Sequence, residues 1–453
     1  MELNACLAYL DKSSSYDPRF TLGVLRQLPQ MYRSFNAGSL REAMGGVYGA
    51  HGGEAAGLLG FDGEGESSVQ SPEADIFCLL LISAWCACNA GSPREVERAL
   101  AVGKLVTERC KAYNRRSLDY LEAKAWFYYA QAAFASEDPM AIYGELMAGL
   151  RTATLRHDKE TTAMLIVLLL RVLFHDSRVS QAATLVSKTV FPETASNSLA
   201  ARYMYYLSRI NTVQLDYSTA FSQITQAIRK CPQTTSALGF LRAAQKQSVL
   251  IELLMGDIPS REIFKRPELR DALEPYFALS RAVRFGDVQA FNAAITRYTP
   301  QLRADKTYKV ALRLHQNVIK TAIRVISLTY LRISLRDMCL KLHLDSEEST
   351  EYMVAKAIRD GVIDAEINHA KGYMQSRETL DIYATSEPQH AFNDRIQFCM
   401  TLHDDSVKAM RYLDTDHRDD LKDAEEARER EKELVTEIQE GTDLEDYDAD
   451  YDM

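Results

Sequence analysis

The chain has 453 residues, of which 46% are hydrophobic and 26% are charged, and this length favours two or three folded domains. Its net charge is −10, but the segment from Leu413 onward carries 18 acidic and 5 basic residues, a net charge of −13, which leaves +3 for the rest. A nearly neutral body gives no general reason to expect a nucleic-acid-binding protein.

Cysteine usage and hydropathy narrow the class further. The eight cysteines are sparse and lie mostly in apolar helical contexts, which predicts reduced thiols in a cytosolic or nuclear protein. Cys86 and Cys88 lack a second pair at zinc spacing, so we expect no metal site and no cofactor. The first residues do not resemble a targeting segment. The apolar stretch 163–174 is shorter than the roughly 20 residues that span a bilayer, which favours a buried helix.

The N-terminal region, residues 1–110, carries no motif that we can assign. Ten of the 21 glycines lie between Ala37 and Ser68, which predicts a mobile loop over about residues 37–74 within a helical region. These glycines have neither dinucleotide-binding spacing nor a Gly-Lys-Ser/Thr ending, so the sequence does not support a phosphate-binding loop.

Residues 111–303 show the pattern of a helical-repeat solenoid. Apolar residues recur every three or four positions, and helix pairs begin near Ser117, His157 and Ser198, a period of about 40 residues. Further helices are predicted over 240–254 and 267–284, and another from Val288 that Pro300 stops. The clearest repeat has tetratricopeptide-like spacing, with Leu207, Ser208, Ala220, Ile224, Ala227 and Pro232.

Residues 304–386 have the outline of a winged helix. A long helix through Val318 and Tyr330 comes first, Ser334 caps a short helix over 335–342, and a third helix ends at Gly361. Residues 362–367 then alternate apolar and polar, and residues 372–375 return after a turn, which predicts a two-stranded wing.

A last helix is predicted over residues 387–412, followed by an acidic tail, 413–453, that we expect to be largely disordered. Side chains at steps of three and four form one stripe on this helix, which suggests docking into a helical bundle. The stripe consists of Phe392, Ile396, Cys399, His403, Val407 and Met410.

The order of solenoid, winged helix and C-terminal helix resembles that of PCI-domain proteins. Segments 201–210, 317–321, 332–335, 354–363, 381–383 and 406–411 are similar to the proteasome regulatory particle non-ATPase subunit 3 family. The resemblance implies a mainly α protein that acts as a non-catalytic scaffold of the proteasome lid, in the cytoplasm and nucleus. It implies as partners the non-ATPase subunits 7 and 12, the small acidic tether subunit, the deubiquitinating MPN pair and the proteasome base, and no membrane.

Two surfaces are therefore candidate interfaces. An unpaired strand edge can accept a strand from a neighbour, so we expect the wing to pair with another subunit. The candidate wing-edge residues are Val362, Ile363, Asp364, Ala365, Glu366, Ile367, Gly372 and Tyr373. The second interface is the stripe on the C-terminal helix.

The residues give no catalytic constellation, so we do not expect an enzyme: no two of the nine histidines are two positions apart, and no nucleophile motif is present. The alternative is a PCI subunit of a signalosome, initiation-factor or mRNA-export complex that contacts nucleic acid. Glu347, Glu348 and Glu351 at the start of the third helix oppose such contact, and only Lys356 and Arg359 offset them. A basic region at Lys306, Lys309, Arg313, Lys320 and Arg324 keeps the alternative open.

Overall fold

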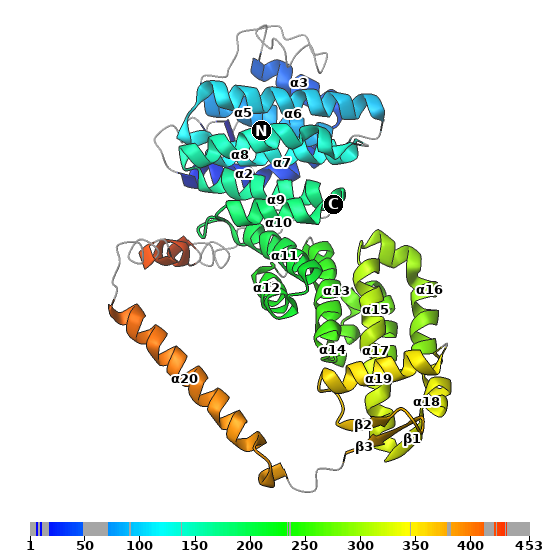
Figure 1. Cartoon of the computed structure of the whole chain (residues 1–453). Coiled ribbons are helices and arrows are strands. Elements are labelled where there is room, and N and C mark those ends of the chain that lie inside the picture. Colours follow the sequence, from blue (N-terminus) through cyan, green and yellow to red (C-terminus); the bar gives the residue numbers. More distant parts are fainter. Residues whose placement is uncertain are drawn as a thin grey trace. The chain divides into compact units, whose positions relative to one another are not determined.

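The computed structural model describes residues 6, 7, 10, 18–48, 71–89, 92–136, 138–232, 234, 237–344, 346–377, 382–411, 421, 422, 424–430 and 432. The chain is mainly helical and carries one small antiparallel sheet (Figure 1), which confirms the predicted fold class. It divides into an N-terminal unit, residues 1–215, 222–241 and 429–453, and a C-terminal unit, residues 216–221 and 242–428. The predicted domain boundaries themselves stay predictions.

The N-terminal unit is a stack of helices whose central members are buried on nearly all sides. Residues 76–82 of α5 and residues 163–170, 172 and 173 of α9 are almost fully buried, as the long apolar run of α9 predicted. The helices are α2 (Pro18–Ser34), α3 (Ala37–Tyr48), α5 (Pro72–Cys88), α6 (Pro93–Tyr113), η3 (Arg116–Leu118), α7 (Asp119–Ala135), η4 (Pro139–Ile142), α8 (Tyr143–Arg156), α9 (Lys159–His175), α10 (Val179–Lys188) and α11 (Asn197–Gln214).

The prediction of a loop over residues 37–74 is wrong at both ends. Residues 37–48 form α3, and Pro72 begins α5 after the Ser71 cap. Leu40 and Met44 are one helical turn apart and almost fully buried, so their burial offsets the low helix propensity of the glycines. The rest of the glycine-rich segment, residues 49–70, lies outside the described residues.

Helix starts in the solenoid agree with the predicted repeat. The short helix η3, which leads into α7, begins at Arg116. α9 begins at Lys159, and α11 begins at Asn197. α11 is followed by α12 (Tyr217–Lys230), and the predicted small positions Ser208 and Ala220 are fully buried. These observations confirm the tetratricopeptide-like helix pair.

The C-terminal unit continues with helices that carry the winged-helix module. They are α13 (Leu238–Met255), whose first four residues belong to the N-terminal unit, α14 (Arg261–Lys265), α15 (Pro267–Phe285), α16 (Val288–Ala304) and α17 (Tyr308–Thr329). Pro300 was predicted to stop α16, but it lies inside this helix. Leu302, beyond the proline, is fully buried, and this burial offsets the backbone hydrogen bond that proline cannot donate.

Side chains of the unit lock the winged helix onto the preceding helices. Asn317 of α17 donates from Nδ2 to the carbonyl oxygens of Leu253 and Leu254, at 2.9 and 3.1 Å, and so caps the end of α13. Lys246 Nζ lies 2.8 Å from Asp305 Oδ1, and the buried hydroxyl of Tyr276 donates to the other oxygen of Asp305 at 2.9 Å. These hydrogen bonds therefore tie α13, α15 and α17 together.

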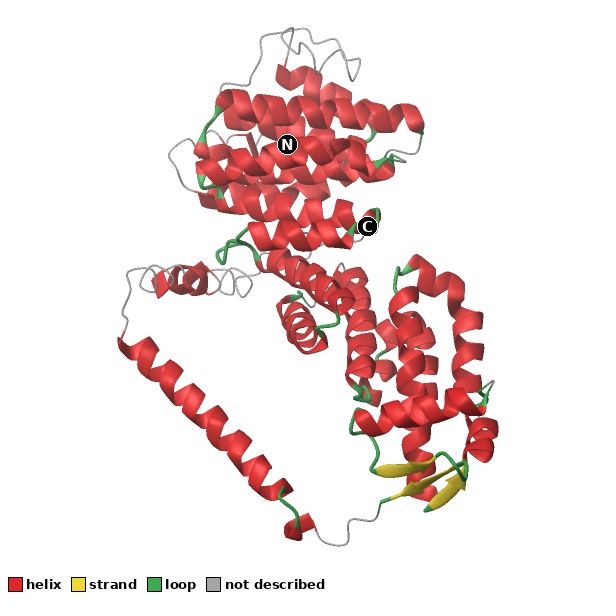
Figure 2. Ribbon diagram, in the orientation of Figure 1, coloured by secondary structure: helices red, strands yellow, loops and turns green. Residues whose placement is uncertain are grey.

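The wing has three strands rather than the predicted two (Figure 2). β1 (Arg332–Ser334) precedes α18 (Leu335–Leu342) and α19 (Glu347–Arg359), and β2 (Ala365–Asn368) and β3 (Tyr373–Ser376) follow. The antiparallel order is β1-β3-β2. A strand of three residues is too short to show alternation, which is why the sequence pattern did not reveal β1. The predicted helix cap at Ser334 and helix end at Gly361 are confirmed.

α20 (Glu387–Arg411) follows η6 (Ile382–Ala384) and matches the predicted C-terminal helix (Figure 1). Within the described part of the chain its side chains are exposed, except the half-buried Pro388 and Val407; the side chain of Arg411 is not described. Within the tail 413–453, which was expected to be largely disordered, the described residues 421, 422, 424–430 and 432 are helical, contrary to that expectation; the other tail positions lie outside the described residues.

Candidate functional site

The strand β2 is an edge strand of the wing, and its outer side is suited to pairing. Asp364 accepts a hydrogen bond from the Arg377 N–H at 2.9 Å, and Glu366 and Asn368 lie opposite Gln375 and Tyr373. Antiparallel ladders alternate between residues that bond inward and residues that point outward, so Glu366 and Asn368 bond to β3. The N–H and C=O groups of the alternate residues, Ala365 and Ile367, therefore point away from the sheet.

The returning strand cannot serve as an edge, contrary to the prediction for Gly372 and Tyr373. Tyr373 lies opposite Ser334 of β1 and Asn368 of β2, because β3 is the central strand. The Gly372 carbonyl accepts from the Leu335 N–H at 2.9 Å. Both sides of this strand are occupied within the chain, so it has no free side for a neighbour.

Three of the predicted wing-edge residues precede the strand. The Val362 N–H donates to the Ala357 carbonyl at 3.0 Å and completes the end of α19. Ile363 is 5% exposed and belongs to the core, and Asp364 is the residue held by Arg377. Of the predicted edge set, Ala365, Glu366 and Ile367 therefore lie in β2.

Side chains on the two faces of the sheet fix its orientation. Ile333 and Met374 are buried on the face toward the helices. On the opposite face the Arg332 guanidinium lies 3.6 Å from the centroid of the Tyr373 ring, and Arg377 Nη2 donates to Glu366 Oε1 at 2.8 Å. The sequence pattern did not indicate this ring contact, because it joins residues 41 positions apart.

α20 presents the predicted stripe to solvent. Phe392, Ile396 and Met410 are 63%, 57% and 72% exposed, and Cys399 and His403 are also exposed. A second pair, Phe398 and Leu402, is 69% and 57% exposed and lies one turn apart on an adjoining side of the helix. The predicted stripe does not include this second apolar strip.

Two cations of the winged helix, Lys320 and Lys356, bind groups within the protein. Lys320 Nζ lies 2.7 Å from Asp360 Oδ2, and this hydrogen bond lowers the pKa of Asp360. Lys356 Nζ donates to Gln316 Oε1 at 3.2 Å, while Glu347 and Glu348 occupy the first turn of α19. The arrangement disfavours a phosphate backbone along α19.

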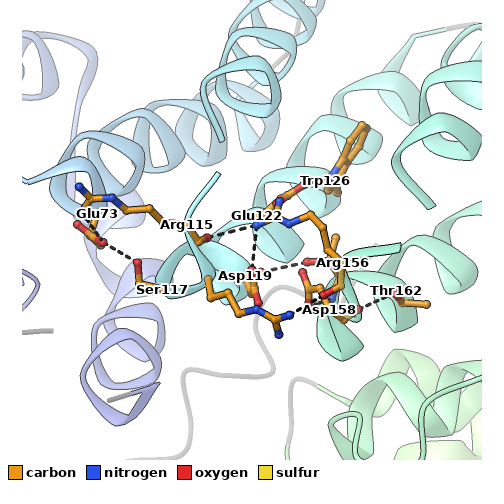
Figure 3. A network of polar contacts seen from close by, with 11 residues as sticks. Glu73, Arg115, Ser117, Asp119, Glu122, Trp126, Arg156, Asp158 and Thr162 are labelled. Carbon is orange, nitrogen blue, oxygen red and sulfur yellow. Dashed lines mark hydrogen bonds and ion pairs between the residues drawn. The ribbon is translucent and has the colours of Figure 1, made fainter. Parts of the chain in front are cut away.

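A partly buried polar network ties α7, α8 and α9 together (Figure 3). Arg156, in the last turn of α8, lies 3.3 Å from Glu122 Oε2 and 3.5 Å from Asp119 Oδ1. Burial and the nearby Asp158 raise the pKa of Asp119 to about 7. One guanidinium thus faces two carboxyl groups, and one of these has a raised pKa.

The described residues contain no group of three or more His, Cys, Asp or Glu side chains arranged to hold a metal ion. In the same residues, no helix has both the length and the apolar character needed to cross a bilayer.

Comparison with known families assigns all three parts of the chain. Residues 61–280 match a model described as PSMD3-like, N-terminal TPR repeats, residues 296–378 match the PCI domain, and residues 381–446 match the model for the C-terminal part of a proteasome regulatory subunit. A protein of Schizosaccharomyces pombe named probable 26S proteasome regulatory subunit rpn3 is 44% identical over 427 residues, 94% of this chain and 85% of the relative. The chain belongs to the Rpn3 family, that of 26S proteasome non-ATPase regulatory subunit 3.

Other Rpn3-family members give the same result. A protein of Anopheles gambiae named probable 26S proteasome non-ATPase regulatory subunit 3 is 44% identical over 447 residues, 95% of this chain and 89% of the relative. The 26S proteasome regulatory subunit RPN3 of Saccharomyces cerevisiae is 47% identical over 311 residues, 66% of this chain and 60% of the relative. The family model from residue 61 and these alignments also reach into residues 1–110, where the sequence alone offered no assignment.

Proposed function

We propose that the chain is a non-catalytic scaffold subunit of the 26S proteasome lid that works in ubiquitin-dependent protein degradation. The observation that carries the proposal is that one chain of the Rpn3 family has two exposed surfaces. One is the outward-facing strand edge at Ala365 and Ile367, and the other is the amphipathic helix α20. Both are surfaces that bind polypeptides.

The wing edge and α20 are proposed to have different partners. β2 adds a strand from the winged helix of a neighbouring PCI subunit, with non-ATPase subunits 7 and 12 as the candidates. α20 packs with helices of the deubiquitinating MPN pair, and the chain also contacts the small acidic tether subunit and the proteasome base. We also propose that the protein acts in the cytoplasm and nucleus.

The experiment that tests this function is a native purification of the tagged chain with identification of everything that co-purifies. The proposal expects the proteasome ATPases and lid subunits, which would assign the complex. Recovery of signalosome, initiation-factor or mRNA-export subunits, or of RNA, would instead favour the alternative assembly.

A further inference from the structure

The segment 288–336 of the C-terminal unit concentrates positive charge. It contains nine arginine and lysine residues and one acidic residue, a net charge of +8 in a chain whose total is −10. The acidic residue, Asp305, already binds Lys246 Nζ and the hydroxyl of Tyr276. The basic residues are Arg297, Arg303, Lys306, Lys309, Arg313, Lys320, Arg324, Arg332 and Arg336. The helices α16 and α17 contain no aspartate or glutamate, so neither balances this charge along its own length.

Helical periodicity places four of these side chains on one face of α17. They are separated by steps of four, seven and four residues, and Gln316 occupies the turn between the second and the third. The four are Lys309, Arg313, Lys320 and Arg324. From the first to the last, the face runs for about 22 Å along the helix. Lys309, Gln316 and Arg324 are exposed, so this face of α17 is open to solvent.

The end of α19, which packs on α17 (Figure 1), adds two further cations to this face. Lys356 Nζ donates to Gln316 Oε1 at 3.2 Å, so this lysine lies against the face and its partner there is uncharged. Asp360 lies between two cations, with Oδ2 2.7 Å from Lys320 Nζ and Oδ1 3.6 Å from Arg359 Nη2. We call the six cations the basic strip, and with Asp360 its net charge is +5. The basic strip consists of Lys309, Arg313, Lys320, Arg324, Lys356 and Arg359.

The spacing of the basic strip suits an extended peptide that carries acidic side chains. Residues four apart on a helix are about 6 Å apart along its axis, and alternate residues of an extended chain are about 6.6 Å apart. About seven extended residues therefore cover the distance from Lys309 to Arg324. Leu312 and Leu328, 43% and 79% exposed, each lie one helical turn from a residue of this face. They offer apolar contacts beside the charges.

A nucleic acid fits the same surface less well. Glu347 and Glu348 occupy the first turn of α19, and Glu348 lies eight residues, about 12 Å, before Lys356. A duplex that followed both helices would bring its phosphates close to these carboxylates. A peptide that lies along α17 alone would not meet them.

We propose that the basic strip binds an extended acidic segment of a partner protein, with the carboxylates of that segment on the lysine and arginine side chains. Clusters of this kind recognise acidic motifs through charge-assisted hydrogen bonds. Because the strip is at the surface, binding weakens as salt is added. This inference goes beyond the proposed lid function and does not depend on which assembly contains the chain.

The test measures binding of a labelled peptide of six alternating Glu-Ser pairs to the purified full-length chain by fluorescence anisotropy. Binding should weaken about fivefold or more when salt is raised from about 50 to about 200 mM. A peptide with glutamine in place of each glutamate should bind at least tenfold more weakly. Equal binding of the two peptides would overturn the proposal.

Variants of the chain identify the surface. Lys309→Glu with Arg324→Glu should weaken binding of the glutamate peptide at least tenfold, and the milder pair Lys309→Gln with Arg324→Gln at least threefold. Arg270→Glu with Arg281→Glu makes the same change of charge at exposed positions of α15 in the same unit and should change binding less than threefold. Far-ultraviolet circular dichroism confirms that the variants are folded. Equal loss in the strip and α15 reversal pairs would overturn the strip as the site.

An oligothymidylate of seven nucleotides, which has six phosphates, is the charge-matched probe for a nucleic-acid partner. The chain should bind it at least fivefold more weakly than the peptide with six glutamates, at the same salt concentration. Equal or tighter binding of the oligonucleotide would overturn the assignment of the strip to an acidic peptide.

Discussion

Gly286 and Ala322 meet backbone to backbone. A Cβ atom on Gly286 would lie 2.7 Å from both the Cα and the N of Ala322, and Gly286 has a φ of +70°. The turn between α15 and α16 therefore rests directly on α17, the helix that carries the winged helix. Position 286 requires glycine for two independent reasons: the backbone is left-handed there, and there is no space for a side chain.

Gly286→Ala should destabilise this packing far more than a substitution that only strains a left-handed backbone conformation. Gly361 has the same φ of +70° but no atom within 4 Å of its Cβ position, so Gly361→Ala measures the conformational cost, about 1 kcal/mol. Gly286→Ala should cost at least about 2 kcal/mol more, because the backbone of α17 cannot move aside as a side chain can. Hydrogen exchange of α15–α17 measures both effects, and equal exchange in the two variants would contradict the contact.

The carboxyl group of Asp119 should make the N-terminal unit less stable as pH rises. Its pKa is raised to about 7 in the folded chain, from 3.8, so the folded state binds more protons between those values. The contribution of Asp119 to the free energy of unfolding therefore falls between about pH 4 and about pH 7. At higher pH the full destabilisation by this residue is present. Asp119→Asn should remove it and gain about 1–2 kcal/mol at pH 8, allowing for partial exposure, and less at pH 5.

Tryptophan fluorescence is the suitable probe for this prediction. Both tryptophans of the chain, Trp85 and Trp126, lie in the N-terminal unit, and Trp126 Nε1 donates to Glu122 Oε1 at 3.4 Å within the same network. Glu97→Gln, at an exposed position, is the control for removing one negative charge and should keep the wild-type pH dependence. A gain from Asp119→Asn that is the same at pH 5 and pH 8 would refute the role of its titration.

The outward-facing N–H of Ala365 should be needed for association with a neighbouring PCI subunit. Proline at this position removes that donor but leaves the inward bonds of Glu366 and Asn368 to β3, so the wing itself should persist. Ala365→Val keeps the donor and favours a strand, and serves as the control. We expect Ala365→Pro to weaken binding to the neighbour at least tenfold by biolayer interferometry; unchanged binding would rule out strand addition at β2.

The sequence was informative where burial follows a helical period and less so where tertiary packing overrides local preference. The predicted starts of α7, α9 and α11 agree with the structure, because apolar residues in these helices recur in steps of three and four. α3 and the course of α16 through Pro300 were missed, since buried Leu40, Met44 and Leu302 outweigh the local effects of glycine and proline.

The candidate site shows the same division. The position of β2 could be predicted from alternation, but which strand is central depends on β1, whose three residues pair with β3 across about 40 positions of sequence. No local pattern encodes that pairing, so the assignment of Gly372 and Tyr373 to an edge failed. The strip of Phe398 and Leu402 was visible in the sequence and missed because one seam had been taken to define the helix.

The central claim, that the chain holds partners through exposed surfaces, is tested most directly on α20. Ile396→Asp with Val407→Asp places two charges in the stripe, and Gln397→Asp with Thr401→Asp places the same charges on the polar side of the helix. Tagged chains are purified natively and co-purifying proteasome subunits are quantified, with circular dichroism as the check on folding. The account predicts that the stripe variant keeps its fold and loses the proteasome subunits, while the polar-side variant retains them. Normal recovery of the deubiquitinating subunits with the stripe variant would contradict it.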